Sequence, residues 1–191
     1  NHSYSQYNLG ILYLRGELIP RDIDKSIHYF SLAANQNHSD AQYNLGVLYS
    51  KGGLIPRDMN KSIYYYSLAA NQNHSNAQYN LGILYEDGDL IPRDMNKSIY
   101  YYSLAANQNQ SDAQYNLGVL YSKGELIPRD MDKSIYYYSL AANQNHSNAQ
   151  YNLGYLYSKG ELITRDINKS IYYFSLAADQ NHAKAQRNLG L

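Results

Sequence analysis

Residues 39–74 contain two segments in which apolar and small side chains recur every three or four positions, as on one face of an α-helix. In the first segment these positions are Ala41, Leu45, Leu48 and Tyr49. Ser39 followed by Gln42 fits a capping box at the start of a helix, and Gly52 is a typical residue after a helix end. The pattern therefore predicts a first helix from Ser39 to about Gly52, in which Gly46 lets a neighbouring helix approach closely.

The second segment places small and aromatic side chains on one face, at Ser62, Tyr65, Tyr66, Ala69 and Ala70. Asp58 precedes it as a typical N-cap residue, and Asn73 follows as a residue that tolerates the left-handed backbone of many helix ends. Residues 52–57 form the turn between the two helices, and we expect Leu54 and Ile55 to be buried beneath it. Residues 39–74 are thus predicted to form a helix-turn-helix unit.

The unit recurs along the chain, because a Leu-Gly doublet occurs every 36 residues, at Leu9-Gly10, Leu45-Gly46, Leu81-Gly82, Leu117-Gly118, Leu153-Gly154 and Leu189-Gly190. The repeats span residues 3–38, 39–74, 75–110, 111–146 and 147–182, and residues 183–191 are a partial sixth. Helices of about 11 to 13 residues are marginally stable alone in water, so the repeats must stack. The sequence predicts a single all-α solenoid over residues 1–191. Both ends fall inside a repeat and the chain opens with Asn, which favours a fragment of a longer protein.

These positions resemble the Sel1-like repeat, a branch of the tetratricopeptide-like solenoids. The family pattern maps without gaps onto Ala41, Leu45, Gly46, Tyr49, Gly52, Ile55, Asp58, Lys61, Ser62, Tyr65, Tyr66, Ala69, Ala70 and Asn73. Leu54, Ser62 and Asn73 depart from the residues that are usual in the family, and these departures concern the turns rather than the architecture. The resemblance implies an all-α fold, a right-handed α/α superhelical solenoid of five 36-residue helix-turn-helix repeats plus a partial sixth. It also implies a protein that holds other proteins in complexes.

Composition narrows the classes of function. The chain has 191 residues with 16 Lys and Arg against 16 Asp and Glu, so it lacks the basic surface typical of nucleic-acid binding. The absence of Cys excludes disulfide frameworks, thiolate zinc sites and cysteine nucleophiles. No apolar run is long enough for membrane insertion and these residues contain no recognisable signal peptide, which favours the cytoplasm. The 24 Tyr residues must contribute to the core, and a bias towards A/T-rich codons is the alternative explanation for part of their number.

No residue pattern points to catalysis, a cofactor or a metal, because an active site needs groups that occur at one place and these groups recur in every repeat. His38, His74, His146 and His182 are one repeat apart, too far to share a metal, and are interpreted as solvated loop residues. Glu86, Asp87 and Asp89 lack the spacing of a calcium loop and are interpreted as a solvated acidic patch. Sequons such as Asn37-His38-Ser39 coincide with helix caps and are interpreted as by-products of an Asn-rich composition.

The repeats differ from one another mainly on the side of the first helix opposite its packed face. In tetratricopeptide-like superhelices this side lines the concave groove. The resemblance therefore implies a partner-binding groove lined by Tyr7, Asn8, Tyr43, Asn44, Val47, Lys51, Tyr79, Asn80, Ile83, Asp87, Tyr115, Asn116, Val119, Lys123, Tyr151, Asn152, Tyr155 and Lys159. Tyrosine gives a large contact area at low entropic cost and the Asn amide can bond a backbone, so the expected partner is a protein or peptide. Sequence drift at exposed positions is the alternative.

A second exposed stripe, a convex ridge, is predicted on the second helices at Tyr64 and Leu68, Tyr100 and Leu104, Tyr136 and Leu140, and Tyr172 and Leu176. The sequence leaves open whether the groove or this ridge binds a partner. The predicted function is a non-catalytic interaction scaffold or adaptor. The alternatives are a regulatory or targeting arm of a larger enzyme whose catalytic domain lies outside these residues, and a structural array without a groove ligand.

Overall fold

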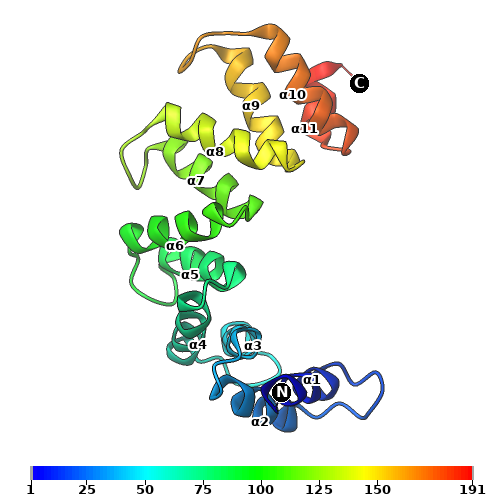
Figure 1. The fold of residues 1–191 in the computed structure, drawn as a ribbon. Coiled ribbons are helices and arrows are strands. Elements are labelled where there is room, and N and C mark those ends of the chain that lie inside the picture. The colour runs from blue at the N-terminus through cyan, green and yellow to red at the C-terminus, as the bar shows by residue number, and fades with distance from the viewer. Residues whose placement is uncertain (1, 191) are drawn as a thin grey trace. The chain divides into compact units, whose positions relative to one another are not determined.

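A computed structural model describes residues 2–190, and all regular structure in these residues is helical (Figure 1). The five repeats contain α1 (His2–Arg15) and α2 (Ile23–Ala34), α3 (Ser39–Lys51) and α4 (Met59–Asn71), α5 (Ser75–Asp87) and α6 (Met95–Asn107), α7 (Ser111–Lys123) and α8 (Met131–Asn143), and α9 (Ser147–Lys159) and α10 (Ile167–Asp179). The partial sixth repeat contributes α11 (Ala183–Leu189). The predicted fold of helix-turn-helix repeats is confirmed.

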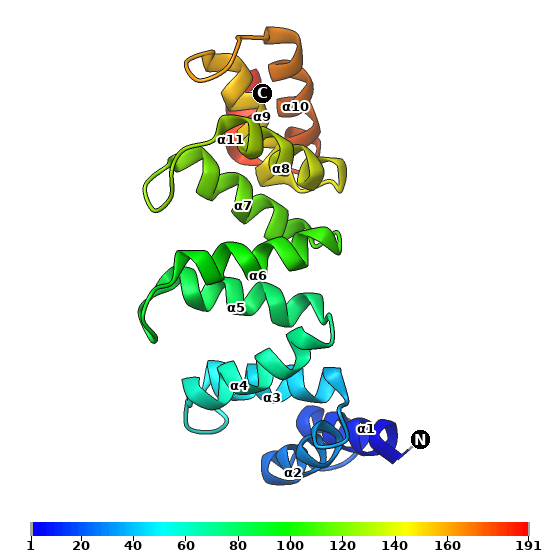
Figure 2. The same cartoon turned by 60° about the vertical axis from the view of Figure 1, so that its left-hand side comes forward.

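The chain forms two compact units, the first ending at Leu104 and the second beginning at Ala105, within α6. In the first unit α1 packs on α2 and α3 on α4, while α2 also contacts α3 and α4 contacts α5. The second unit repeats this order, with α7 on α8, α8 on α9, α9 on α10 and α10 on α11 (Figure 2). Inside each unit the second helix of a repeat therefore contacts both its own first helix and the first helix of the next repeat. Such a stack is stabilised by contacts between neighbouring repeats.

The second helix of each repeat begins at an aspartate, as predicted. Asp58 has an extended backbone with φ −143°, and its side chain accepts a hydrogen bond of 3.0 Å from the backbone N–H of Lys61. The Lys61 ammonium lies 3.6 Å from the Asp58 carboxylate and 5.0 Å from the centre of the Tyr49 ring. The same arrangement joins an aspartate, a lysine and a tyrosine in the other four repeats.

The first helix does not begin with the predicted capping box. Its N-cap is His38, and Ser39 already belongs to α3. Gln42 is 1% exposed, donates a 3.1 Å hydrogen bond to the Ala34 carbonyl of α2, and accepts one of 2.7 Å from Gln72 at the end of α4. A buried carbonyl needs a donor, so the glutamine bonds the preceding repeat instead of its own helix start. Equivalent bonds join Gln78 to Ala70, Gln114 to Ala106 and Gln150 to Ala142.

The two helices of a repeat approach closely at a glycine. A Cβ atom added to Gly46 would lie 2.5 Å from the ring of Tyr66, which is 3% exposed. The Ser62 hydroxyl donates a 2.9 Å hydrogen bond to the Gly46 carbonyl, which explains why a serine is accommodated where the family usually has alanine. The predicted packed face of the second helix is therefore confirmed for these residues.

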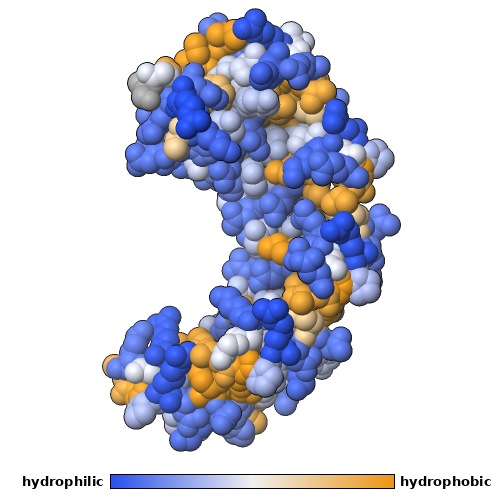
Figure 3. Space-filling view, turned by 180° about the vertical axis from the view of Figure 1, so that it is seen from behind, coloured by the Kyte–Doolittle hydropathy of each residue, from blue (hydrophilic) through white to orange (hydrophobic). Residues whose placement is uncertain are grey.

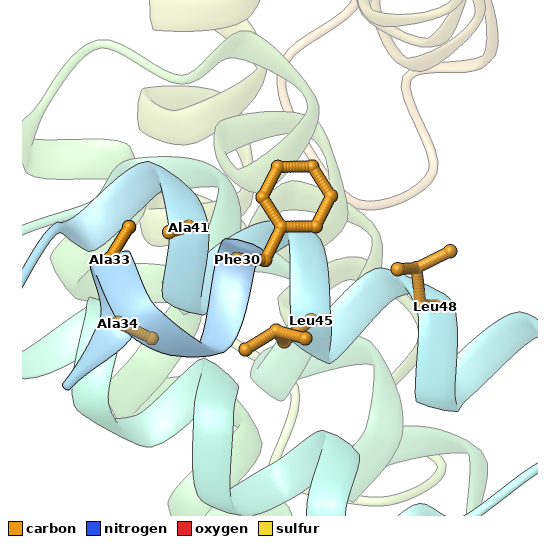
Figure 4. Packing of buried hydrophobic residues seen from close by; sticks show 6 residues of the cluster. All are labelled: Phe30, Ala33, Ala34, Ala41, Leu45 and Leu48. Carbon is orange, nitrogen blue, oxygen red and sulfur yellow. The ribbon is translucent and has the colours of Figure 1, made fainter. Parts of the chain in front are cut away.

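Contacts between consecutive repeats combine alanines with larger apolar side chains. Figure 4 shows Phe30, Ala33 and Ala34 of α2 beside Ala41, Leu45 and Leu48 of α3. Ala41 and Leu45 are completely buried. The small alanines let the helices approach, and the predicted packed face of the first helix is confirmed.

The turn between the helices buries only one of the two apolar residues expected beneath it. Gly52 has a positive φ of +66°, which favours glycine, and the Asp58 N–H donates a 3.0 Å hydrogen bond to the Tyr49 carbonyl. Ile55 packs against the core cluster of Phe30 and Leu45. Leu54 is 44% exposed, so its predicted burial is wrong. Leu54 and Ile55 are adjacent in a tight turn, and only Ile55 reaches the core.

Candidate functional site

Exposed apolar side chains alone do not single out one binding site. On the face shown in Figure 3, hydrophobic surface forms separate patches surrounded by hydrophilic side chains. The ridge tyrosines Tyr64, Tyr100, Tyr136 and Tyr172 are each 59% exposed, whereas the accompanying leucines, such as Leu68, are half-buried. A candidate site is better located from hollows in the surface.

A pocket of about 290 Å³, here called the first-unit pocket, lies between α3 and α5. Its lining residues are Tyr43, Val47, Ser50, Lys51, Tyr66, Asn80, Ile83 and Leu84. Val47 and Ile83 come from facing first helices, while Tyr66 reaches the pocket from α4. The walls are apolar or aromatic, and Ser50, Tyr66 and Asn80 supply neutral polar groups.

The second unit contains a pocket of about 350 Å³, here called the second-unit pocket, at the equivalent place between α7 and α9. Its lining residues are Tyr115, Val119, Ser122, Lys123, Tyr138, Asn152, Tyr155, Leu156 and Leu162. Tyr155 stands where the first-unit pocket has Ile83, so this pocket has a larger aromatic wall. Both units therefore form the same kind of pocket from the same repeat positions.

The two pockets bring together ten of the residues predicted for the groove, Tyr43, Val47, Lys51, Asn80 and Ile83 in one, and Tyr115, Val119, Lys123, Asn152 and Tyr155 in the other. They do not include the remaining eight, which are Tyr7, Asn8, Asn44, Tyr79, Asp87, Asn116, Tyr151 and Lys159. The sequence reasoning did not select Ser50, Tyr66 and Leu84 as site residues. The sequence did contain a signal for two of them. Ser50 lies at a variable position of the first helix, where other repeats have Leu14 or Glu86, and Phe30 and Phe174 replace Tyr66 in the terminal repeats.

Tyr43 holds consecutive repeats together as well as lining a pocket. Its ring stacks on His74 with centroids 4.6 Å apart and contacts Tyr66 at 5.9 Å. The Nδ1 atom of His74 accepts a 3.3 Å hydrogen bond from the Ala77 N–H at the start of α5, and its Nε2 lies 3.2 Å from the Asp40 carboxylate. The interpretation of the junction histidines as solvated loop residues is therefore wrong. All four occupy N-cap positions and stack on tyrosines, and His74, His146 and His182 also accept a backbone hydrogen bond.

Other junctions repeat this arrangement with substitutions. Tyr115 stacks on His146 and Tyr151 on His182, in both cases at 4.6 Å. His38 is 8% exposed and lies between Tyr7 and Tyr4 at 4.7 and 4.8 Å. Gln110 caps α7 instead of a histidine, through a 2.7 Å hydrogen bond from Ala113 N–H.

The phenol at the floor of each pocket is neutral at physiological pH. Burial raises the pKa of Tyr66 to about 12, and hydrogen bonds with Asn80 and Ser50 oppose this only in part. Burial likewise raises the pKa of Tyr138, which lies 3.3 Å from the Ser122 hydroxyl. The one charged lining residue is therefore Lys51 in the first-unit pocket and Lys123 in the second-unit pocket.

The third repeat pairs its floor tyrosine differently. The Tyr102 hydroxyl donates a 2.7 Å hydrogen bond to the Glu86 carboxylate. The interpretation of Glu86 as part of a solvated acidic patch is thus wrong, while Asp87 and Asp89 are exposed. The floor residue alone does not determine the residue at this position. Tyr66 and Tyr102 are accompanied by Ser50 and Glu86, and Phe30 and Phe174 by Leu14 and Ser158.

Ionisation of the floor tyrosines predicts a loss of stability at alkaline pH. Because the fold disfavours the Tyr66 phenolate, its contribution is complete below the ordinary phenol pKa of about 10 and is lost as the pH rises towards about 12. We expect ionisation of Tyr66 to cost about 2 to 3 kcal/mol over this range. Urea unfolding followed by circular dichroism between pH 9 and 12 measures the loss.

The matched control is Tyr66→Phe, because phenylalanine occupies the equivalent position at Phe30 and Phe174 and cannot ionise. We expect this variant to lose less stability between pH 10 and 12 than the original chain. An equal alkaline loss in Tyr66→Phe would assign the effect to other groups.

Within residues 2–190 no three His, Cys, Asp or Glu side chains are grouped so that they could hold a metal ion. Among the described helices, none is long and apolar enough to cross a membrane.

Comparison with known proteins supports the repeat assignment. A solved Sel1 repeat protein from Oxalobacter formigenes is 29% identical with a TM-score of 0.86, over 100% of this chain and 78% of that one. The protective antigen c5321 of uropathogenic Escherichia coli strains, described as displaying an SLR fold, is 28% identical with a TM-score of 0.79, over 98% of this chain and 48% of that one. Cysteine rich protein B of Helicobacter pylori is 25% identical with a TM-score of 0.53, over 70% of this chain and 96% of that one. No curated protein matches the sequence.

The family model described as Sel1 repeat matches five segments, residues 3–38, 39–74, 75–110, 111–146 and 147–182. Sel1 repeat proteins are generally protein–protein interaction scaffolds and are generally non-catalytic. The matched segments, the stacked helix pairs and the glycine contact between them agree, and the chain belongs to the Sel1 repeat family.

Proposed function

We propose that this chain is a non-catalytic scaffold that binds a peptide segment of a partner protein on its first helices, with the first-unit and second-unit pockets as anchor points. The observation that carries the proposal is the recurrence of one pocket type in both units. Each pocket combines apolar walls with a few polar groups, as ligand sites commonly do.

The pocket walls support this function because they vary while the framework beneath them is constant. The same repeat position is occupied by valine at Val47 and Val119, and by the larger side chains Ile83 and Tyr155. Gly46, Gly82, Gly118 and Gly154, one residue before them, are unchanged. Variable side chains on a fixed stack would give each pocket its own selectivity without changing the fold.

The test closes the pockets with residues that the chain itself uses. In the first repeat Leu14 packs against the core cluster that contains Phe30. The Leu14 and Phe30 pair is introduced at the equivalent positions of both pockets. The substitutions are Ser50→Leu with Tyr66→Phe, and Ser122→Leu with Tyr138→Phe. Peptides are first selected from a randomised displayed library on the original chain, and their affinity is then measured by fluorescence anisotropy.

We expect the four-substitution variant to bind the selected peptides about 30-fold more weakly, the loss of roughly 2 kcal/mol typical of an anchor side chain. Its helicity and melting should stay close to those of the original chain. The control variant Tyr64→Ala with Tyr136→Ala alters the ridge and should retain binding. Loss of binding in the ridge variant, with retention in the closed-pocket variant, would locate the binding face on the second helices. Failure to select any peptide would favour an array without a groove ligand.

Direct truncation of the groove tyrosines is a poorer test. Tyr43 stacks on the N-cap histidine of the next repeat, so Tyr43→Ala is expected to weaken the junction as well as the pocket. The pocket-closing pairs reduce this ambiguity because they leave Tyr43 stacked on His74 and Tyr115 stacked on His146.

A further inference from the structure

We infer that the second-unit pocket selects a large apolar side chain that is flanked by carboxylates, that is, an acidic peptide segment of the partner. This inference rests on the proposed function and adds the chemistry of the ligand. It follows from the charges around the pocket and from the size of its walls.

The repeats 39–74, 111–146 and 147–182 each contain two kinds of lysine. Lys133 is a structural lysine, since its ammonium lies 3.2 Å from the Asp130 carboxylate and 5.0 Å from the Tyr121 ring centre. Lys123 lines the second-unit pocket, is exposed, and has no ion-pair partner among the described residues. A cation at the mouth of a largely apolar pocket, with no carboxylate of its own chain, attracts an anionic group of a ligand.

A second cation lies beside the same pocket. The Lys159 ammonium is 5.7 Å from the centre of the Tyr155 ring, which forms one wall. No Asp or Glu lines the pocket, although Glu161 precedes the lining residue Leu162 in the loop. Tyr138 at the floor stays uncharged because burial raises its pKa. The lining residues are therefore neutral apart from Lys123, with Lys159 adjacent.

The first-unit pocket differs from the second-unit pocket in the charge beside it and in size. It has Lys51 at its mouth, but α5 carries Asp87 where α9 carries Lys159. The second-unit pocket also has Tyr155 in place of Ile83 and the larger volume, about 350 against 290 Å³. The second-unit pocket has two cations and the larger volume. It is therefore the pocket that suits an acidic segment with a large apolar residue.

The test reverses the two cations with Lys123→Glu and Lys159→Glu. Peptides selected on the original chain are expected to carry an aromatic or large aliphatic residue with Asp or Glu within two positions. The charge-reversed variant should bind them at least 10-fold more weakly, and a new selection on it should enrich Lys and Arg instead. Raising the salt concentration from 0.05 to 0.5 M should weaken binding to the original chain.

The control is Lys184→Glu with Arg187→Glu, which makes the same change in net charge at exposed positions of α11 and should bind as the original chain does. Peptides without acidic residues that still depend on an open second-unit pocket, together with unchanged binding by the charge-reversed variant, would overturn the acidic ligand and leave the proposed function standing. Peptides that bind equally well after both pockets are closed would instead overturn the proposed function, and the inference with it.

Discussion

Tyr66→Ala is expected to destabilise the first unit by about 3 to 5 kcal/mol, the usual cost of truncating a buried aromatic side chain. The Tyr66 ring is 3% exposed and packs in a cluster with Ala69, Ala70, Ala77 and Leu81. Its removal leaves a cavity between the two helices of the repeat and the first helix of the next. Urea unfolding at neutral pH, followed by circular dichroism, measures the change.

The close contact between Tyr66 and Gly46 allows a double-mutant cycle that tests the same packing. A Cβ at Gly46 would lie 2.5 Å from the ring, so Gly46→Ala in the original chain should destabilise it by about 1 to 3 kcal/mol through overpacking. In the Tyr66→Ala background the space is free, and Gly46→Ala should stabilise by up to about 1 kcal/mol because alanine is the better helix former. The reversal of sign is the expected result of the double-mutant cycle. Equal destabilisation in both backgrounds would show that another contact limits this position.

The sequence was sufficient to predict the helix pairs and their packed faces. The 36-residue spacing of Leu45-Gly46 and its equivalents defines the repeat, and helical periodicity identifies the buried positions. Asp58 caps the second helix as its residue type predicts. These features depend on local spacing and on residue preferences, which a single sequence contains.

Interactions between repeats could not be predicted in the same way. Gln42 has the spacing of a capping-box residue, but a buried carbonyl of the preceding helix provides a better partner. His38 takes the cap position because the chain is still extended there, with φ −75° and ψ 108°. The bonds of Gln42 depend on the Ala34 carbonyl across the turn and on Gln72 at the end of the following helix, and the sequence pattern specifies the position of neither.

The sequence predicted on which side of the first helix the candidate site residues lie better than it predicted their contacts. The helical wheel correctly grouped Val47, Lys51 and Tyr43 on one side of the first helix, and these residues share a pocket. The wheel could not reveal that Tyr43 stacks on His74, nor that Tyr66 reaches the same pocket from the second helix.

Leu81→Ala and Leu153→Ala are each expected to cost about 2 to 5 kcal/mol, because both side chains are completely buried in the contact between repeats. Leu81 packs with Ala77 and Tyr66 in the first unit, and Leu153 packs with Ala149 and Tyr138 in the second. Truncation removes dispersion contacts and leaves a cavity that rigid neighbouring helices fill poorly. Urea unfolding gives the loss of stability for each variant.

The controls make the same chemical change at exposed turn positions. Leu90 and Leu126 are 49% and 42% exposed, so Leu90→Ala and Leu126→Ala should change stability by no more than about 0.5 kcal/mol. Because a repeat stack is stabilised through nearest neighbours, hydrogen exchange should accelerate most in α4 and α5 for Leu81→Ala and in α8 and α9 for Leu153→Ala. Similar small losses at the buried and exposed leucines would mean that the Leu-Gly doublets do not stabilise the stack, and faster exchange spread evenly along the chain would contradict stabilisation by neighbouring repeats.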